Sequence, residues 1–160
     1  MRLPTSRRLL VAAAITSLVL VGCASDDASP GADDGDGGAG TIVAVSLQEW
    51  AVVPAQDSAP AGDVTFEVTN DGPEDIHEFV VLKTDLGPAG LPVDENGVVS
   101  EEGEGIEVID EIEDIPIGDH RDLTVSMDAG NYVLLCNIWS ADEAEAHYQL
   151  GMRVAFTVDE

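Results

Sequence analysis

Basic residues are scarce in this sequence. Only 6 of its 160 residues are Lys or Arg, against 32 Asp and Glu, and the formal net charge is −26. Nucleic acid binding depends on clustered Lys and Arg that neutralise phosphates, so the composition argues against a nucleic acid partner. The negative charge favours solubility and encounters with basic partners, and adaptation to a salty habitat would produce it equally well.

Long apolar runs are also lacking, with one exception near the start. Residues 9–21 are apolar but too few to span a membrane comfortably, and Arg2, Arg7 and Arg8 precede them, as in a secretory signal peptide. The run ends in Leu-Val-Gly-Cys at 20–23, which resembles the lipobox of bacterial lipoproteins. This resemblance implies removal of residues 1–22, lipidation of Cys23 and anchoring outside the cytoplasmic membrane. The alternative is an ordinary signal peptide, with Cys23 incidental.

Residues 23–40 contain no large apolar side chain. They consist mainly of Asp, Gly, Ala and Ser, a composition that cannot bury a core and predicts a flexible tether after the lipidated Cys23. Residues 41–160 then form one domain, long enough to build a core without disulfides. We expect this domain to be a monomer.

The remaining chain alternates apolar and polar residues over short segments separated by turn signals. In 63–69, for example, Val64, Phe66 and Val68 fall on one face, and Asn-Asp-Gly-Pro follows at 70–73. Long helical patterns are missing, so the sequence predicts an all-β, Greek-key β-sandwich of about seven to eight strands. The expected extended segments are 41–47, 49–54, 63–69, 76–82, 106–112, 122–127, 132–138 and 153–158.

Two connections carry more specific predictions. Residues 59–62, Ala-Pro-Ala-Gly, indicate a turn. Ser140 and Glu143 have the spacing of a capping box, which predicts one helical turn over 140–146.

Between Asp94 and Asp114 there are ten acidic residues and no basic one. That segment is either a solvated excursion without a role or a docking face for a basic redox partner.

Cysteine is nearly absent, and this makes Cys136 informative. With Cys23 assigned to lipid, Cys136 has no disulfide partner in a protein expected to be exported. It is either a buried, inert thiol or a metal ligand. His147 and Met152 lie downstream of Cys136, and His77 lies on an earlier apolar segment. Taken alone, His77 or Met152 would be interpreted as an ordinary core residue. Thiolate, thioether and imidazole together select copper over hard cations.

Three stretches carry a resemblance to a known family. Residues 61–72, 77–81 and 129–138 resemble the cupredoxins, in particular the sulfocyanin- and plastocyanin-like domains, and the likeness covers most of 41–160. It implies a β-sandwich that holds one copper ion cycling between Cu(I) and Cu(II). The implied metal ligands are His77, Cys136, His147 and Met152, and His147 would lie near the surface on the path of the electron.

One departure from the family pattern lies inside the implied site. Ten residues separate Cys136 from His147, a longer loop than is usual in these domains, and it bears on the site's geometry. Trp139 and Tyr148 flank the site, where they would screen the metal, offer a contact face or pack in the core. His120 stands among charged residues and is expected on the surface.

Three functions are compatible with the sequence. The first is a type 1 (blue) copper protein that carries one electron at a time to a redox partner protein. The second is a protein that stores or delivers copper outside the membrane, and the third is a metal-free surface β-sandwich. An enzyme is the least supported class, because three histidines cannot build the additional centres of multicopper oxidases and no triad or phosphate-loop signature is visible.

Overall fold

The computed structural model describes residues 40–160. The predicted signal peptide, the predicted lipidation site Cys23 and almost all of the predicted tether therefore lie outside the described residues. Within the described part of the chain, no helix is long and apolar enough to cross a membrane.

The first of two main sheets has four strands. β1 (Thr41–Gln48) lies between β2 (Ala51–Pro54) and β4 (Gly62–Asn70), and β7 (His120–Met127) completes the order β2-β1-β4-β7. β1 and β4 run parallel, whereas the other pairs are antiparallel. The predicted alternation is present, because Val64, Phe66, Val68 and their neighbours on the same face are buried while intervening residues are not.

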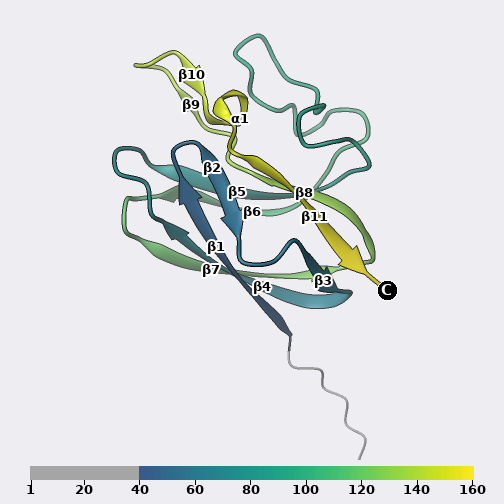
Figure 1. The fold of residues 1–160 in the computed structure, drawn as a ribbon. Coiled ribbons are helices and arrows are strands. Elements are labelled where there is room, and N and C mark those ends of the chain that lie inside the picture. The colour runs from purple at the N-terminus through teal and green to yellow at the C-terminus, as the bar shows by residue number, and fades with distance from the viewer. Residues whose placement is uncertain (1–39) are drawn as a thin grey trace, which may run out of the picture. The chain divides into compact units, whose positions relative to one another are not determined.

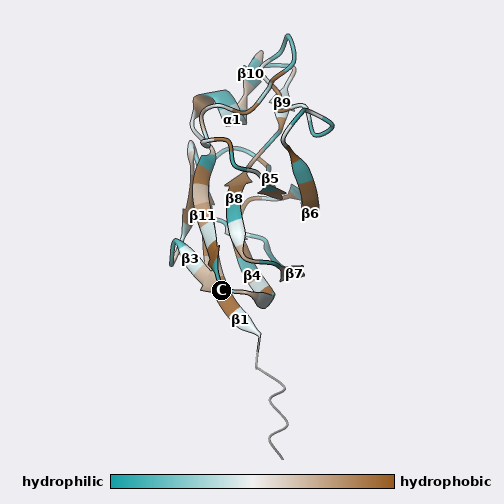
Figure 2. Cartoon of the chain, turned by 90° about the vertical axis from the view of Figure 1, so that its right-hand side faces the viewer, coloured by the Kyte–Doolittle hydropathy of each residue, from teal (hydrophilic) through white to brown (hydrophobic). Residues whose placement is uncertain are grey.

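The second sheet has five strands and forms the other layer (Figures 1 and 2). Its order is β3-β11-β8-β5-β6, with the bounds β3 (Ser58–Pro60), β5 (His77–Lys83), β6 (Glu107–Ile115), β8 (Gly130–Leu135) and β11 (Arg153–Asp159).

Aromatic rings join the two layers. Phe66 of β4 lies with its ring centroid 5.3 Å from that of Phe79 in β5 and 5.6 Å from that of Phe156 in β11. All three side chains are fully or almost fully buried. Because tilted and edge-to-face contacts add to the free energy gained by burial, this cluster holds the sheets together. The prediction of a β-sandwich is confirmed.

Two local predictions differ from the structure. The expected turn at 59–62 is partly a strand, because β3 pairs in parallel with β11. The expected helical turn over 140–146 is a hairpin of β9 (Trp139–Ser140) and β10 (Glu145–Ala146), and one helical turn, α1 (His147–Leu150), follows it. The Ser140 hydroxyl donates to the Glu143 carboxylate, and no backbone cap is formed there. Cross-strand pairing thus prevails over the capping signal.

The segment between β5 and β6 folds over the same end of the sandwich as the hairpin (Figure 1). Tyr148 in α1 anchors it, because its hydroxyl donates to the Pro88 carbonyl and accepts from the Leu91 amide. Asn137 anchors it a second time by bonding to both backbone groups of Val99. Tyr148 is therefore a core residue rather than a surface contact, and the acidic segment is attached to the residue next to Cys136.

Candidate metal centre

Neighbouring strands of the second sheet bring the predicted ligands to one end of the sandwich. His77 is the first residue of β5, Cys136 directly follows β8, and Met152 directly precedes β11. β8 lies between β5 and β11 and pairs with both, so the three chain ends meet. His147 begins α1, the single helical turn that leads back to β11.

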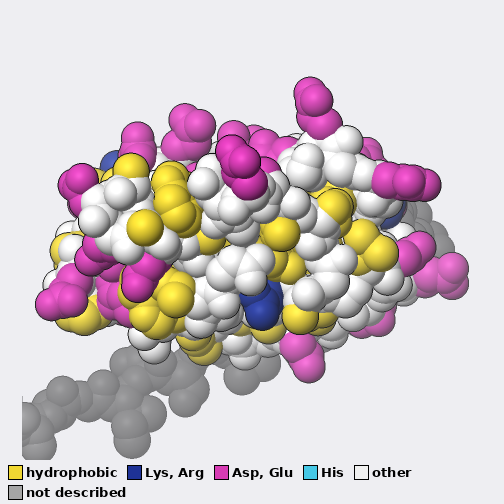
Figure 3. All heavy atoms as spheres, turned by 90° about the horizontal axis from the view of Figure 1, so that it is seen from above, with side chains coloured by type: hydrophobic (Ala, Val, Ile, Leu, Met, Phe, Trp, Pro, Cys, Tyr) yellow, Lys and Arg dark blue, Asp and Glu magenta, His cyan; other side chains and the backbone are white. Residues whose placement is uncertain are grey.

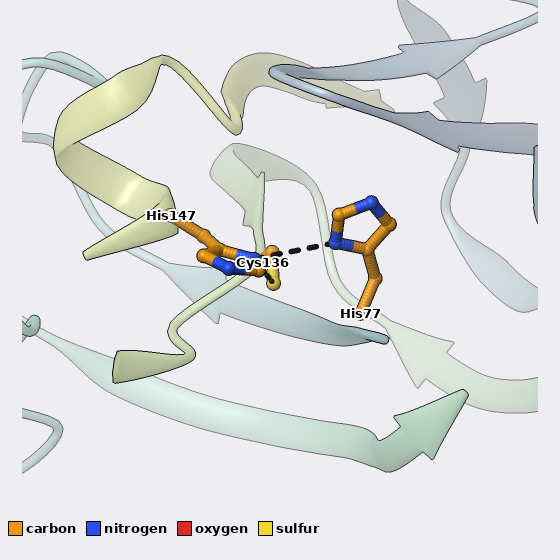
Figure 4. Close-up of side chains that lie close together, drawn as sticks. All are labelled: His77, Cys136 and His147. Carbon is orange, nitrogen blue, oxygen red and sulfur yellow. Dashed lines mark hydrogen bonds between the residues drawn. The ribbon is translucent and has the colours of Figure 1, made fainter. Parts of the chain in front are cut away.

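The side chains of His77, Cys136 and His147 point toward one another (Figure 4). The Nδ1 atoms of the two imidazoles are 3.3 Å apart, and the Sγ of Cys136 is 3.5 Å from Nδ1 of His147. The three donor atoms all lie within 4.8 Å of one another, and the exposed fraction of each residue is 1% or less. The structure thus brings together residues that are far apart in the sequence.

Met152 is bonded to both of its neighbours in this group through the backbone. Its carbonyl accepts from the amide of Cys136 at 3.0 Å, and its amide donates to the carbonyl of His147 at 3.1 Å. Its side chain is fully buried in the same core cluster as Cys136. The fourth predicted ligand therefore belongs to the same end of the core.

Gly151 allows the chain to turn from α1 into β11. Its φ is +129°, a conformation that residues with a side chain rarely adopt, and its amide caps α1. A Cβ at this position would lie 3.0 Å from the carbonyl oxygen of Trp50. Glycine is therefore needed to place Met152 next to Cys136 and His147.

Burial raises the pKa of the Cys136 thiol to about 12, although backbone amides of Ile138 and Glu78 act in the opposite direction. The Glu78 amide donates to Sγ at 3.3 Å. Without a metal the thiol is therefore protonated at neutral pH, and a metal that binds the thiolate must release that proton.

Burial also lowers the pKa of both imidazoles, and for His77 the proximity of His147 lowers it further. Both rings are thus neutral at pH 7, and a neutral imidazole nitrogen can bind a metal. Two imidazoles, one thiol and a thioether close by form a soft and borderline donor set, which fits copper better than magnesium or calcium.

His147 is almost completely covered. Its exposed fraction is 1%, and Figure 3 shows no histidine on the face seen from above. The ring of Trp50 lies edge-on to His147 with the centroids 4.9 Å apart. The β1–β2 connection therefore covers this ring.

Two further residues singled out in the sequence, His120 and Trp139, lie at the surface. His120 lies on the surface, as expected, 2.9 Å from the carboxylate of Asp122. Trp139 is 36% exposed on the hairpin. Sequence reasoning missed Glu49 and Trp50, which contact His77 and His147, because nothing in the local pattern indicates that the β1–β2 connection reaches the site.

No protein-family model matches the sequence, and no curated protein matches it as a relative. Solved structures do match. A dithionite-reduced auracyanin from the photosynthetic bacterium Roseiflexus castenholzii is 22% identical over 77% of this chain and 100% of its own, with a TM-score of 0.54. Auracyanin A of Chloroflexus aurantiacus, described as a "blue" copper protein, is 18% identical over 74% of this chain and 98% of its own, with a TM-score of 0.50.

These matches establish the fold. The chain has the cupredoxin fold, as the resemblance implied, with the His-Cys-His group at one end of the sandwich. At such low identity the likeness concerns the fold alone, so the activity must be argued from the site.

The carboxyl group of Glu78 should make the stability of the metal-free protein depend on pH. Glu78 follows His77 in β5, the strand that pairs with the acidic strand β6. Burial, reinforced by Glu111, Glu101 and Glu113, raises its pKa to about 7. Between pH 4.5 and 7 the Glu78 carboxyl is ionised in the unfolded chain but still protonated in the folded one. The free energy of unfolding therefore falls as the pH rises through this window. We expect a loss of about 2 kcal/mol after allowance for solvent screening.

Denaturant unfolding at pH 4.5 and pH 8 measures this effect. Glu78→Gln should flatten the pH dependence and make the metal-free protein more stable than wild type at pH 8. Glu107→Gln, a change at an exposed position of β6, is the matched control and should leave the dependence in place. An unchanged slope in Glu78→Gln would show that another group is responsible.

Proposed function

We propose that the protein is a type 1 copper protein that carries single electrons. One observation carries the proposal: two imidazole nitrogens and one thiol sulfur converge, fully buried, at the end of a cupredoxin fold. His77, Cys136 and His147 would hold the copper ion, with Met152 as a weaker axial ligand. When bound, copper supplies a centre that accepts and releases one electron.

The chain would contribute geometry and environment. The ends of the neighbouring strands β5 and β8 fix His77 and Cys136, and the helical turn α1 that leads into β11 carries His147, so the ligand positions would change little when the metal changes oxidation state. The Glu78 amide bonds to the thiol sulfur and would moderate its donation to the metal. Burial of all three donors excludes water, which favours a retained electron carrier over a site that exchanges its metal.

We further propose that the protein works outside the cytoplasmic membrane, attached by lipid on Cys23 with 24–40 as a tether. The sequence motif at 20–23 supports this. Acidic side chains lie around the end of the sandwich seen from above (Figure 3). This distribution supports a redox partner with a basic face.

Copper titration of the purified domain tests the function. We expect one equivalent of Cu(II) to give an intense visible thiolate-to-copper charge-transfer band, a spin-resonance spectrum with narrow copper hyperfine splitting, and reversible bleaching by one electron. A colourless protein that binds Cu(I) and releases it rapidly to a chelator would instead identify a copper storage or delivery protein. A protein that binds no copper would be a metal-free surface domain.

A further inference from the structure

A carboxylate lies on the outer side of the His77 ring. While Nδ1 of His77 faces His147 and Cys136, its Nε2 points to Glu49 in the connection between β1 and β2, 3.5 Å from Oε1. Nε2 of His77 and Oε2 of Glu49 are the two buried side-chain polar atoms without a hydrogen-bond partner among the described residues. Buried polar atoms are normally paired, so this pair of neighbours needs an explanation.

The carboxylate of Glu49 is held in a specific place. Oε1 accepts from the amide of Asp75 at 3.0 Å and from that of Glu74 at 3.4 Å. A Cβ on buried Gly72 would lie 2.4 Å from Oε1, so the absence of a side chain there leaves room for the carboxylate. Burial acts to raise the pKa of Glu49, whereas the backbone amides of Asp75, Glu74 and Glu49 itself and the proximity of His77 act together to lower it.

We propose that Glu49 is a positioning residue for the copper ligand His77: its carboxylate accepts a hydrogen bond from the Nε2–H group and thereby directs the unprotonated Nδ1 toward the metal. An imidazole that binds a metal through one nitrogen carries its proton on the other, and Glu49 is the acceptor within reach of that proton. Such outer partners fix the orientation of the ring and raise its basicity. The negative charge also favours Cu(II) over Cu(I), because the oxidised ion carries the greater positive charge.

This inference rests on the proposed copper site, so wild-type copper binding is measured first. Glu49→Ala removes both the acceptor and the charge. Glu49→Gln keeps an oxygen that accepts from the loop amides and from Nε2, and removes the charge alone. Glu74→Gln and Glu74→Ala change an exposed acid on the adjoining turn and serve as matched controls.

We expect Glu49→Ala to weaken Cu(II) binding about 10- to 100-fold, the range typical of lost outer partners. Glu49→Gln should weaken Cu(II) binding more than Cu(I) binding and so raise the reduction potential. Glu49→Ala should also disturb the position of His77, whereas Glu49→Gln should leave it in place. A purely structural role would not shift the potential in the Gln variant. Affinity within twofold of wild type and a potential equal to that of the Glu74 variants would overturn the proposal.

A second measurement does not depend on copper. Nitrogen-15 spectra of the metal-free protein report which nitrogen of His77 carries the proton. In wild type the proton should reside on Nε2, and Glu49→Ala should produce a mixture of the two tautomers. If wild type binds no copper but shows this change, the proposed function fails while the contact stands. If the Nε2 tautomer persists in Glu49→Ala, Glu49 does not position the ring.

Discussion

Replacement of Cys136 by Ser should abolish the visible charge-transfer band of the copper-loaded protein completely. The band requires a thiolate bound to Cu(II), and the Sγ of Cys136 is the sulfur that lies 3.5 Å from Nδ1 of His147. A hydroxyl in its place is a hard, weakly acidic donor, which does not replace thiolate as a ligand for copper. Absorption and spin-resonance spectra of the variant after copper addition measure the effect.

The matched comparison is Met152→Leu. Met152 is the proposed axial ligand, which binds weakly and tunes the potential, so its loss should leave the band in place and change the reduction potential. Leu has nearly the same volume as Met, and such swaps in a core usually cost less than about 1.5 kcal/mol. Cys136→Ala is a second control, because it removes the thiol without placing a hydroxyl in the core and so separates loss of the ligand from misfolding. A blue Cys136→Ser protein would disprove the proposed centre.

Loading with copper should stabilise the domain strongly. A ligand that binds the folded state alone adds about 4 kcal/mol when its free concentration is a thousand times its Kd. The structure supports a large effect, because the metal would fill a cage of buried donors that the fold already brings together, His77 and Cys136 at strand ends and His147 on the helical turn α1. We expect the Tm of the loaded protein to exceed that of the metal-free protein by about 10–20 °C.

Scanning calorimetry of the metal-free and the copper-loaded domain, prepared without oxygen as the Cu(I) form, measures this difference. Cys136→Ala is the control, because it lacks the central donor and should show a much smaller increase. Equal values of Tm for the two forms of wild type, at copper concentrations that saturate binding, would contradict the buried site.

The sequence was sufficient to predict the sandwich and its main strands. The alternation around Val64, Phe66 and Val68 reports directly on which face of a strand is buried, because successive side chains point to opposite sides. A lone thiol followed by His147 and Met152 was likewise visible in the sequence, because these residue types define a kind of chemistry without reference to structure. The convergence of His77, Cys136 and His147 was predicted from the family resemblance, and the structure shows it.

Other features depend on contacts between distant segments, which a local pattern does not encode. The capping signal at Ser140 and Glu143 gave way to a hairpin, because pairing of Trp139 with Ala146 satisfies the backbone there. The burial of His147 under Trp50, and the approach of Glu49 to His77, come from a connection that belongs to the other sheet. The sequence by itself thus determined the kind of site and the two layers that carry it. Only the tertiary structure decided that Trp50 covers His147 and that the carboxylate of Glu49 lies beside His77. Both contacts depend on how the two sheets pack against each other.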